Sequence, residues 1–300
     1  MGLRWRGNVY LLLAAFIWGT TFVAQTVGME RIGPFTYGAA RFFLGALALG
    51  GLWLLTGGHR RSAVRTGTHF GGFRAGAGAG FLMFAASALQ QFGMQYTTVG
   101  KASFLTCLYL VLVPLAGAFL GKRPRAEHWL GAALATAGLY LLCMKESFVL
   151  GYGDAIEFVG AFFWTAHILF IARFAAHVDI VEMSLAQVIV TCLLNFLAAL
   201  FFETATVEDV LSAWWALFYA GVLSTGVAFT LQIAGQREAE PAPASVIMSL
   251  ESVFGALAGW IVLGQTLTFR ETAGCALMAA GMLAAQAGGL LFGRRKGKLS

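Results

Sequence analysis

The chain has 300 residues, of which 59% are hydrophobic and only 11% are charged. A soluble globular domain carries about 25% charged and about 45–50% apolar residues, so both values indicate a protein surrounded mainly by lipid. The net charge of +6 comes from short loops and the C-terminal segment, not from a long basic patch with interleaved aromatic residues. Nucleic acid is therefore excluded as an expected partner.

Ten apolar stretches run along the sequence, each near the length of about 20 residues that crosses a bilayer. We expect ten helices joined by short connections, the longest of which (57–74) has the composition of a flexible cytosolic loop. The first stretch, 9–27, is longer than the apolar core of a signal peptide, about 7–15 residues, so we interpret it as an uncleaved helix. The expected spans are 8–27, 34–56, 74–94, 98–120, 127–145, 154–174, 181–202, 211–233, 243–263 and 271–292.

Lysine and arginine in the loops predict the orientation, because cytoplasmic loops of membrane proteins are enriched in them. The side that holds both termini carries 15 of these residues, and the opposite side carries Arg31, Lys101, Lys145 and Arg270. Both termini should therefore be cytoplasmic, in what we expect to be the inner (plasma) membrane of a bacterium. The remaining one, Arg41, lies early in the second span, where it either snorkels to the outer interface, the role that we expect, or binds an anion.

The sequence also contains an internal repeat. Residues 14–18 resemble residues 160–164, Ala102-Ser103 matches Ala244-Ser245 at an offset of 142, and later glycines match at 143. The small drift in offset predicts a duplicated five-helix unit, residues 1–148 and 149–300. Five is odd, so the second copy should be inverted, as in transporters with a midplane site. The fold class that we predict is an all-α membrane protein of two inverted repeats.

Small residues let helices approach closely in lipid, and we expect several glycines to serve in this way. They are Gly117 and Gly121, Gly255 and Gly259, Gly131 and Gly138, and Gly274 and Gly281. The four cysteines, at positions 107, 143, 192 and 275, lie in or at the end of apolar stretches without C-x-x-C spacing. We interpret them as small buried hydrophobes, and we expect no metal and no cofactor.

Ionisable residues at membrane depth are functional hypotheses by default. Glu251, well inside the ninth span, either recognises a substrate cation, couples transport to protons, or forms an internal hydrogen bond that locks two helices. Glu157, Trp164 and His167 share one stripe of the sixth span. Glu157 is either a solvated helix end or a coupling group, and His167 is either a packing residue or a proton relay.

Further polar and aromatic residues could face a central cavity. Trp18 and Gln25 share a face of the first span, and Trp18 is the repeat mate of Trp164. Amides in later spans either bond a substrate or bridge helices: Gln91, Gln95, Gln187, Asn195 and Gln232. Pro114 should interrupt the fourth span, whereas Pro241 should open the ninth as a first-turn proline.

Enzyme signatures are missing from the sequence. There is no G-x-S-x-G, no H-E-x-x-H, no Walker loop and no dinucleotide-binding fingerprint. We therefore expect neither an enzyme nor transport that this chain itself drives with ATP.

Two motifs carry a family resemblance. Residues 15–22 (AFIWGTTF) and 241–254 (PAPASVIMSLESVF) resemble the first and ninth helices of EamA-type drug/metabolite transporters. The resemblance implies ten helices, inverted repeats, a central cavity and a small-molecule substrate, and it places Glu251 on the glutamate of the ninth-helix motif. Many members carry Gly-Glu after the fourth and ninth helices, where this chain has Gly121-Lys122 and Gly264-Gln265.

We therefore predict a secondary transporter, an exporter or exchanger of metabolites, amino acids or amphipathic compounds, whose halves rock about the cavity. Glu251, His167 and Glu157 are the coupling candidates, and a homodimer is compatible with the sequence. An intramembrane enzyme with a lipid-soluble substrate and a lipid scramblase are the alternatives. The predicted substrate-binding wall consists of Trp18, Gln25, Gln91, Gln95, Trp164, His167, Gln232 and Glu251.

Overall fold

The computed structural model describes residues 2–29, 32–56, 71–121, 124–144, 150–264 and 266–291. Within these ranges the regular elements are helices, without a β-strand, which confirms the predicted all-α class. Seven of the described helical segments are long and apolar enough to cross a membrane, and α1, α7 and α15 lie at the other predicted positions. The predicted long loop at 57–74 lies mostly outside the described residues.

Residues with known preferences for helix starts lie at the first turns of several helices. Pro34 occupies the first turn of α2, where its missing N–H has no intrahelical partner to lose. Thr98 caps α5 by accepting the Lys101 N–H. The helices up to residue 144 are α1 (Gly2–Gly28), α2 (Pro34–Leu55), α4 (Gly72–Gly93), α5 (Val99–Thr106), α6 (Tyr109–Phe119) and α7 (Ala126–Cys143).

The C-terminal helices follow the same plan, except that the eighth span contains a ten-residue π-helix, η1. Such wide turns are rare and often lie at functional sites. Pro241 opens α13 as predicted. The elements are α8 (Tyr152–Phe174), α9 (Ile180–Phe202), α10 (Val207–Ser212), α11 (Trp214–Phe218), η1 (Tyr219–Ala228), α12 (Phe229–Glu238), α13 (Pro241–Met248), α14 (Glu251–Leu263) and α15 (Phe269–Leu291).

The fourth and ninth spans are each divided in two, at positions 142 residues apart. The Leu108 amide bonds to the carbonyl three residues earlier (3.2 Å), and the Leu250 amide does the same (3.1 Å). Both spans therefore tighten to a 3₁₀ turn before the helix resumes. We expected Pro114 to interrupt the fourth span, but this prediction is wrong because Pro114 lies inside α6. In the fourth span the tightened turn lies before Pro114, at Leu108. The ninth span has no proline at its tightened turn, at Leu250.

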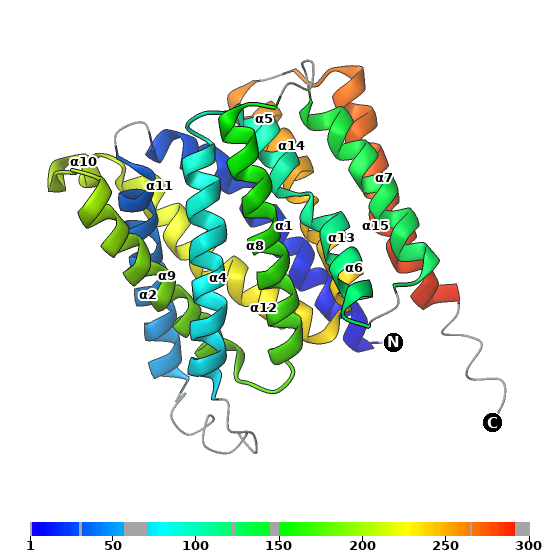
Figure 1. Cartoon of the computed structure of the whole chain (residues 1–300), viewed down its shortest axis with the longest axis horizontal. Helices are drawn as coiled ribbons and strands as arrows, with labels where there is room; N and C mark the ends of the chain where they lie inside the picture. The colour runs from blue at the N-terminus through cyan, green and yellow to red at the C-terminus, as the bar shows by residue number, and fades with distance from the viewer. Residues whose placement is uncertain are drawn as a thin grey trace.

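Glycine contacts hold α7 against α15, which lie side by side in Figure 1. A Cβ on Gly138 would lie 2.5 Å from the Gly274 carbonyl oxygen, and one on Gly131 would lie 2.7 Å from that of Gly281. These distances confirm the predicted packing role of the four glycines. Gly117 and Gly121 have no such role, because a Cβ at either position meets nothing within 4 Å. Gly121 instead follows the end of α6 with a φ of +79°, a conformation that favours glycine.

Helix packing divides the bundle into two groups that do not coincide with the halves of the chain. In one group α9 packs against α2 and α4, α4 against α8, and α1 against α12 and η1. In the other, α7 packs against α15 and α6 against α13. The second group also contains α5 and α14, which contact α7, and the two groups meet where α1 packs against α13 and α14 and where α8 packs against α5 and α6. Each group therefore combines helices from both parts of the chain.

Carboxylates at the two ends of α9 fasten the first group. Glu203 accepts the amides of Phe35 (2.9 Å) and Thr36 (2.7 Å) at the start of α2. Glu182 accepts the Phe73 amide (3.2 Å) at the start of α4. Unbonded amides at a helix N-terminus carry partial positive charge, so a carboxylate there stabilises the helix. α9 thus connects α2 at one end of the bundle with α4 at the other.

Candidate functional site

A cavity lies where the two helix groups meet. About 60 Å³ of its space is open to the centres of water molecules, and one water needs about 10–15 Å³ on this measure. The cavity thus has room for a few waters in this conformation. Its lining residues come from both parts of the chain: Trp18, Gln25, Arg41, Gln90, Thr106, Tyr109, Trp164, Ile168, Ser224, Phe229, Gln232, Met248 and Glu251.

Aromatic rings form one wall of the cavity. Phe229 lies between the two predicted repeat mates, with ring centroids 5.0 Å from Trp18 and 6.3 Å from Trp164. Both tryptophans line the cavity. Their indole Nε1 atoms are buried and have no hydrogen-bond partner among the described residues. Buried polar groups are nearly always bonded, so two unpaired N–H donors beside a cavity are consistent with a site that a solute completes.

Glu251 lines the same cavity at the start of α14 and is 8% exposed. The Cys107 thiol and the Tyr109 hydroxyl both donate to its Oε1 at 3.3 Å. In the part of the chain that the structure describes, no lysine or arginine forms an ion pair with it. An internal hydrogen bond is therefore present, with a thiol and a phenol as donors.

The two tightened turns meet beside Glu251. Tyr109 precedes Glu251 by 142 residues, so equivalent positions of the proposed repeat contact one another. Ser103 and Ser252 add a hydroxyl–hydroxyl bond of 2.8 Å between α5 and α14. Cys107 is thus more than the small hydrophobe that we expected, although it is fully buried. Sequence reasoning missed Tyr109, and applying the repeat offset to Glu251 would have found it.

Glu157 lies directly behind the cavity wall. Its side chain is fully buried, and its Oε2 accepts a 3.0 Å hydrogen bond from Thr106 Oγ1, whose residue lines the cavity. Its Oε1 has no partner among the described atoms. The predicted alternative of a solvated helix end is therefore wrong. Glu157 is a buried carboxyl one residue away from the cavity.

His167 is fully buried and is not among the residues that line the cavity. Its Nε2 lies 3.1 Å from Gln187 Oε1, and its ring packs edge-on against Trp164 and Phe229. His167 therefore supports the aromatic wall from behind and bridges α8 to α9.

The predicted amides divide between the cavity and its surroundings. Gln25 and Gln232 line it, and the Gln232 Oε1 has no partner in the described chain. Gln91 is buried one layer back, where its Nε2 donates to Gln25 Oε1 at 3.3 Å. Gln95 is exposed beyond the end of α4, whereas Gln90, which lies in the last turn of the helix next to Gln91, lines the cavity. We placed Gln91 and Gln95 on one face of a longer helix, but α4 ends at Gly93, before Gln95.

Arg41 corrects a further expectation. It does not snorkel to the outer interface but is 5% exposed and lines the cavity. Its guanidinium carbon lies 4.8 Å from the Phe42 ring centroid and 5.7 Å from that of Tyr37. At this level α2 packs closely against η1, because a Cβ on Gly221 would lie 2.8 Å from the Arg41 carbonyl oxygen.

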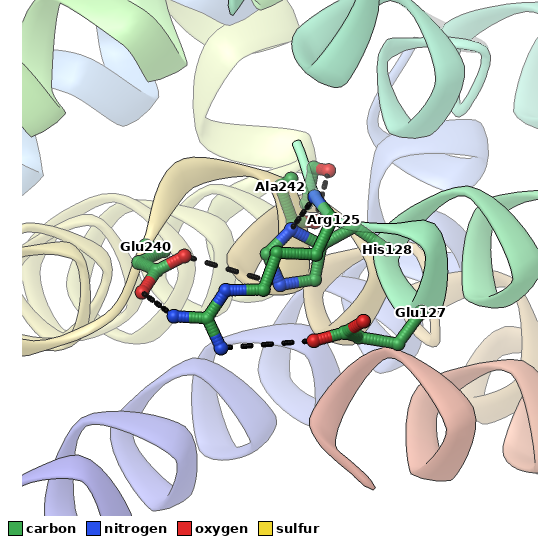
Figure 2. Close-up of polar contacts among 6 residues, drawn as sticks. Arg125, Glu127, His128, Glu240 and Ala242 are labelled. Carbon is green, nitrogen blue, oxygen red and sulfur yellow. Dashed lines mark hydrogen bonds and ion pairs between the residues drawn. The ribbon is translucent and has the colours of Figure 1, made fainter. Parts of the chain in front are cut away.

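The end of the bundle where α1 begins and α15 ends is here called the terminus side (Figure 1). Figure 2 shows Arg125 and His128 of the α7 start facing Glu240, which precedes α13. Arg125 lies 4.0 Å and His128 Nε2 lies 3.9 Å from the Glu240 carboxylate. These three residues line a second pocket of about 410 Å³ between α1, α7, α13 and α15. The contact joins the N-terminal and C-terminal parts of the chain at this end.

The model of the EamA-like transporter family matches residues 5–144 and 151–285 of the chain. The chain belongs to the EamA-like transporter family. It is consequently an integral membrane protein and a membrane transporter, as the two motifs and the apolar helices predicted. Lys122 and Gln265, the departures from the common Gly-Glu motif, lie outside the described residues.

Other members resemble this EamA-like transporter over most of their length. An uncharacterized transporter of Archaeoglobus fulgidus is 28% identical, over 88% of this chain and 80% of that protein. The uncharacterized transporters YoaV and YwfM of Bacillus subtilis are 24% and 27% identical, each over 94% of its own length. A solved crystal structure that is 22% identical has a TM-score of 0.78 and covers 96% of this chain and 98% of its own. That likeness shows the fold.

Proposed function

We propose that this EamA-like transporter is a secondary transporter that exports or exchanges a small amphipathic metabolite by alternating access. Transport, not catalysis, is the activity that we assign to it. The observation that carries the proposal is the cavity between the two helix groups. It combines an aromatic wall with buried polar atoms that have no partner among the described residues, on Trp18, Trp164 and Gln232. A solute with a flat apolar part and a few polar atoms complements such a lining.

The packing favours a specific pair of moving bodies. The glycine contacts of α7 with α15 and the carboxylate caps of α9 each hold helices within one group. The cavity lies at the boundary between the groups. The two groups, rather than the two halves of the chain, would therefore rock against each other around the solute.

Opening toward the terminus side would pass through the pocket beside Arg125, His128 and Glu240. Arg125 and Glu240 are each nearly half exposed, and exposed ion pairs contribute only about 0–1 kcal/mol. The contact in Figure 2 is therefore weak enough to form and break in each cycle.

Glu251 is the coupling residue in this proposal. Its hydrogen bonds to Cys107 and Tyr109 join α14 to α5 and α6 at the tightened turns. Gain or loss of a proton at this carboxyl changes which partners can bond to it, and so links the charge in the cavity to helix geometry. Glu157, bonded to Thr106 behind the wall, is the second candidate, and His167 supports Trp164.

The experiment is a screen for thermal stabilisation of the detergent-purified protein against a metabolite library. A bound solute raises stability by mass action. Ligands found in the screen are then tested on Glu251→Gln, with Glu208→Gln, an exposed acid of α10, as the control. We expect the Glu251 variant to lose stabilisation, and its transport in proteoliposomes to lose its pH dependence, while the control behaves as wild type.

Other results would redirect the assignment. Unaltered pH-dependent flux in Glu251→Gln would remove the coupling role. Turnover of a lipid-soluble substrate by the purified protein would favour the intramembrane enzyme. Lipid movement without saturable, competable solute flux would favour the scramblase.

A further inference from the structure

Arg41 is a buried cation without a counter-charge among the described residues. It is 5% exposed, it donates no hydrogen bond, and it forms no ion pair with any described residue. Its Nε is buried without a partner. Burying a charge is costly unless the charge is paired. An anion that binds beside this guanidinium in the cavity would offset the free-energy cost of burying its charge.

The guanidinium is arranged to receive an anion in the cavity. The rings of Tyr37 and Phe42 support it at 5.7 and 4.8 Å, within the range of about 6 Å at which a cation is attracted to a ring. A guanidinium presents its N–H groups as a planar fork, and this fork matches the two oxygens of a carboxylate. The residue lines the cavity that also contains Trp18 and Trp164, whose N–H groups are unpaired.

We propose that Arg41 is the anion-binding residue of the central cavity and that the transported solute carries a carboxylate. The inference deepens the proposed function, on which it rests. Organic acids and amino acids both have this group, and their apolar parts would lie against Trp18, Phe229 and Trp164. Glu251 on the same cavity selects against solutes with a second negative charge unless its own carboxyl is protonated.

The test is a binding panel of matched pairs, in which each carboxylic acid is accompanied by its primary amide on the same skeleton. One set is phenylalanine, phenylpropionate, phenylpropanamide and phenethylamine, and the metabolite library supplies further pairs. Affinity is measured by thermal stabilisation of wild type, Arg41→Gln, Arg41→Lys and Arg173→Gln. Arg173 is an exposed arginine in the last turn of α8 and serves as the matched control.

We expect acids to stabilise wild type better than their amides. Arg41→Gln should weaken acid binding by about tenfold or more, as for loss of a charge-assisted hydrogen bond, with little change for amides. Arg41→Lys keeps the charge and should lose an intermediate part of the affinity for acids. This variant tests the inference if Arg41→Gln does not fold. Arg173→Gln should bind as wild type does.

Three results would overturn the inference. If amides or amines bind as well as acids, or if both Arg41 variants bind acids like wild type, the carboxylate assignment fails while the transporter assignment stands. If sodium chloride alone stabilises wild type but not Arg41→Gln, and no acid competes, the site holds an inorganic ion. If no compound binds wild type, both this inference and the cavity of the proposed function fail.

Discussion

Some buried side chains line the cavity, and others lie behind these and support them. Gln232, Trp18 and Trp164 have unpaired polar atoms and line the cavity. His167 lies one layer behind them and is bonded to Gln187 at 3.1 Å. The sequence predicted that all four face the inside of the bundle. Helical periodicity does not distinguish the residues that line the cavity from those one layer behind. Side-chain length and the tilt of each helix decide that difference.

His167 and Gln187 give a prediction at this scale. Replacing His167 with Phe keeps a ring against Trp164 but leaves the Gln187 amide without its partner. We expect a loss of about 1–3 kcal/mol in the free energy of unfolding, the cost of an unsatisfied buried group. The double variant His167→Phe/Gln187→Met should recover part of it, because both polar partners are then gone. Thermal unfolding in detergent measures the four proteins as a double-mutant cycle, and strictly additive losses would contradict the pairing.

At the scale of helices, small residues decide which helices approach each other. Gly138 and Gly274, each of which has a second glycine seven residues away, meet backbone to backbone, whereas Gly117, which belongs to a G-x-x-x-G motif, faces open space. The spacing of glycines therefore shows that close packing is allowed but not where a partner helix lies.

This contrast gives a matched pair of variants. Gly138→Ala places a Cβ 2.5 Å from the Gly274 carbonyl oxygen, so α7 and α15 must separate, and overpacking of this kind costs about 1–3 kcal/mol. Gly117→Ala meets no atom within 4 Å and should stabilise α6, since alanine is favoured over glycine in a helix by about 1 kcal/mol. Thermal unfolding should therefore move in opposite directions for the two. An equal loss in both would show that α7 and α15 do not pack as described.

At the scale of the whole molecule, the packing groups combine helices from distant parts of the chain. α9 fastens α2 and α4 through Glu203 and Glu182, and the cavity forms only where the two groups meet. Cavity residues accordingly come from positions as far apart as Trp18 and Glu251. The proposed boundary of the repeat near residue 148 divides the sequence but does not divide the bundle.

The orientation of the molecule is testable at the same scale. Lysine and arginine counts predict that both termini are cytoplasmic. A green fluorescent protein fused after residue 300 should therefore fluoresce in a bacterial host, whereas alkaline phosphatase fused there should be inactive. The control is a phosphatase fusion truncated after residue 204, beyond α9, which should be active. The opposite pair of results would invert the proposed topology.

The sequence by itself determined the membrane class, the helix positions and the family, because hydrophobic length and local motifs are properties of contiguous residues. It also predicted that Glu251, Trp18 and Trp164 face a central cavity, and all three line the one in the structure. Only the tertiary structure decided that Arg41 faces the cavity, that Gln90 replaces Gln95 there, and that Tyr109 bonds to Glu251. These depend on how α2 is rotated in the bundle, on where α4 ends, and on two tightened turns meeting across the bundle. Such features arise from contacts between segments far apart in the chain, which local periodicity does not encode.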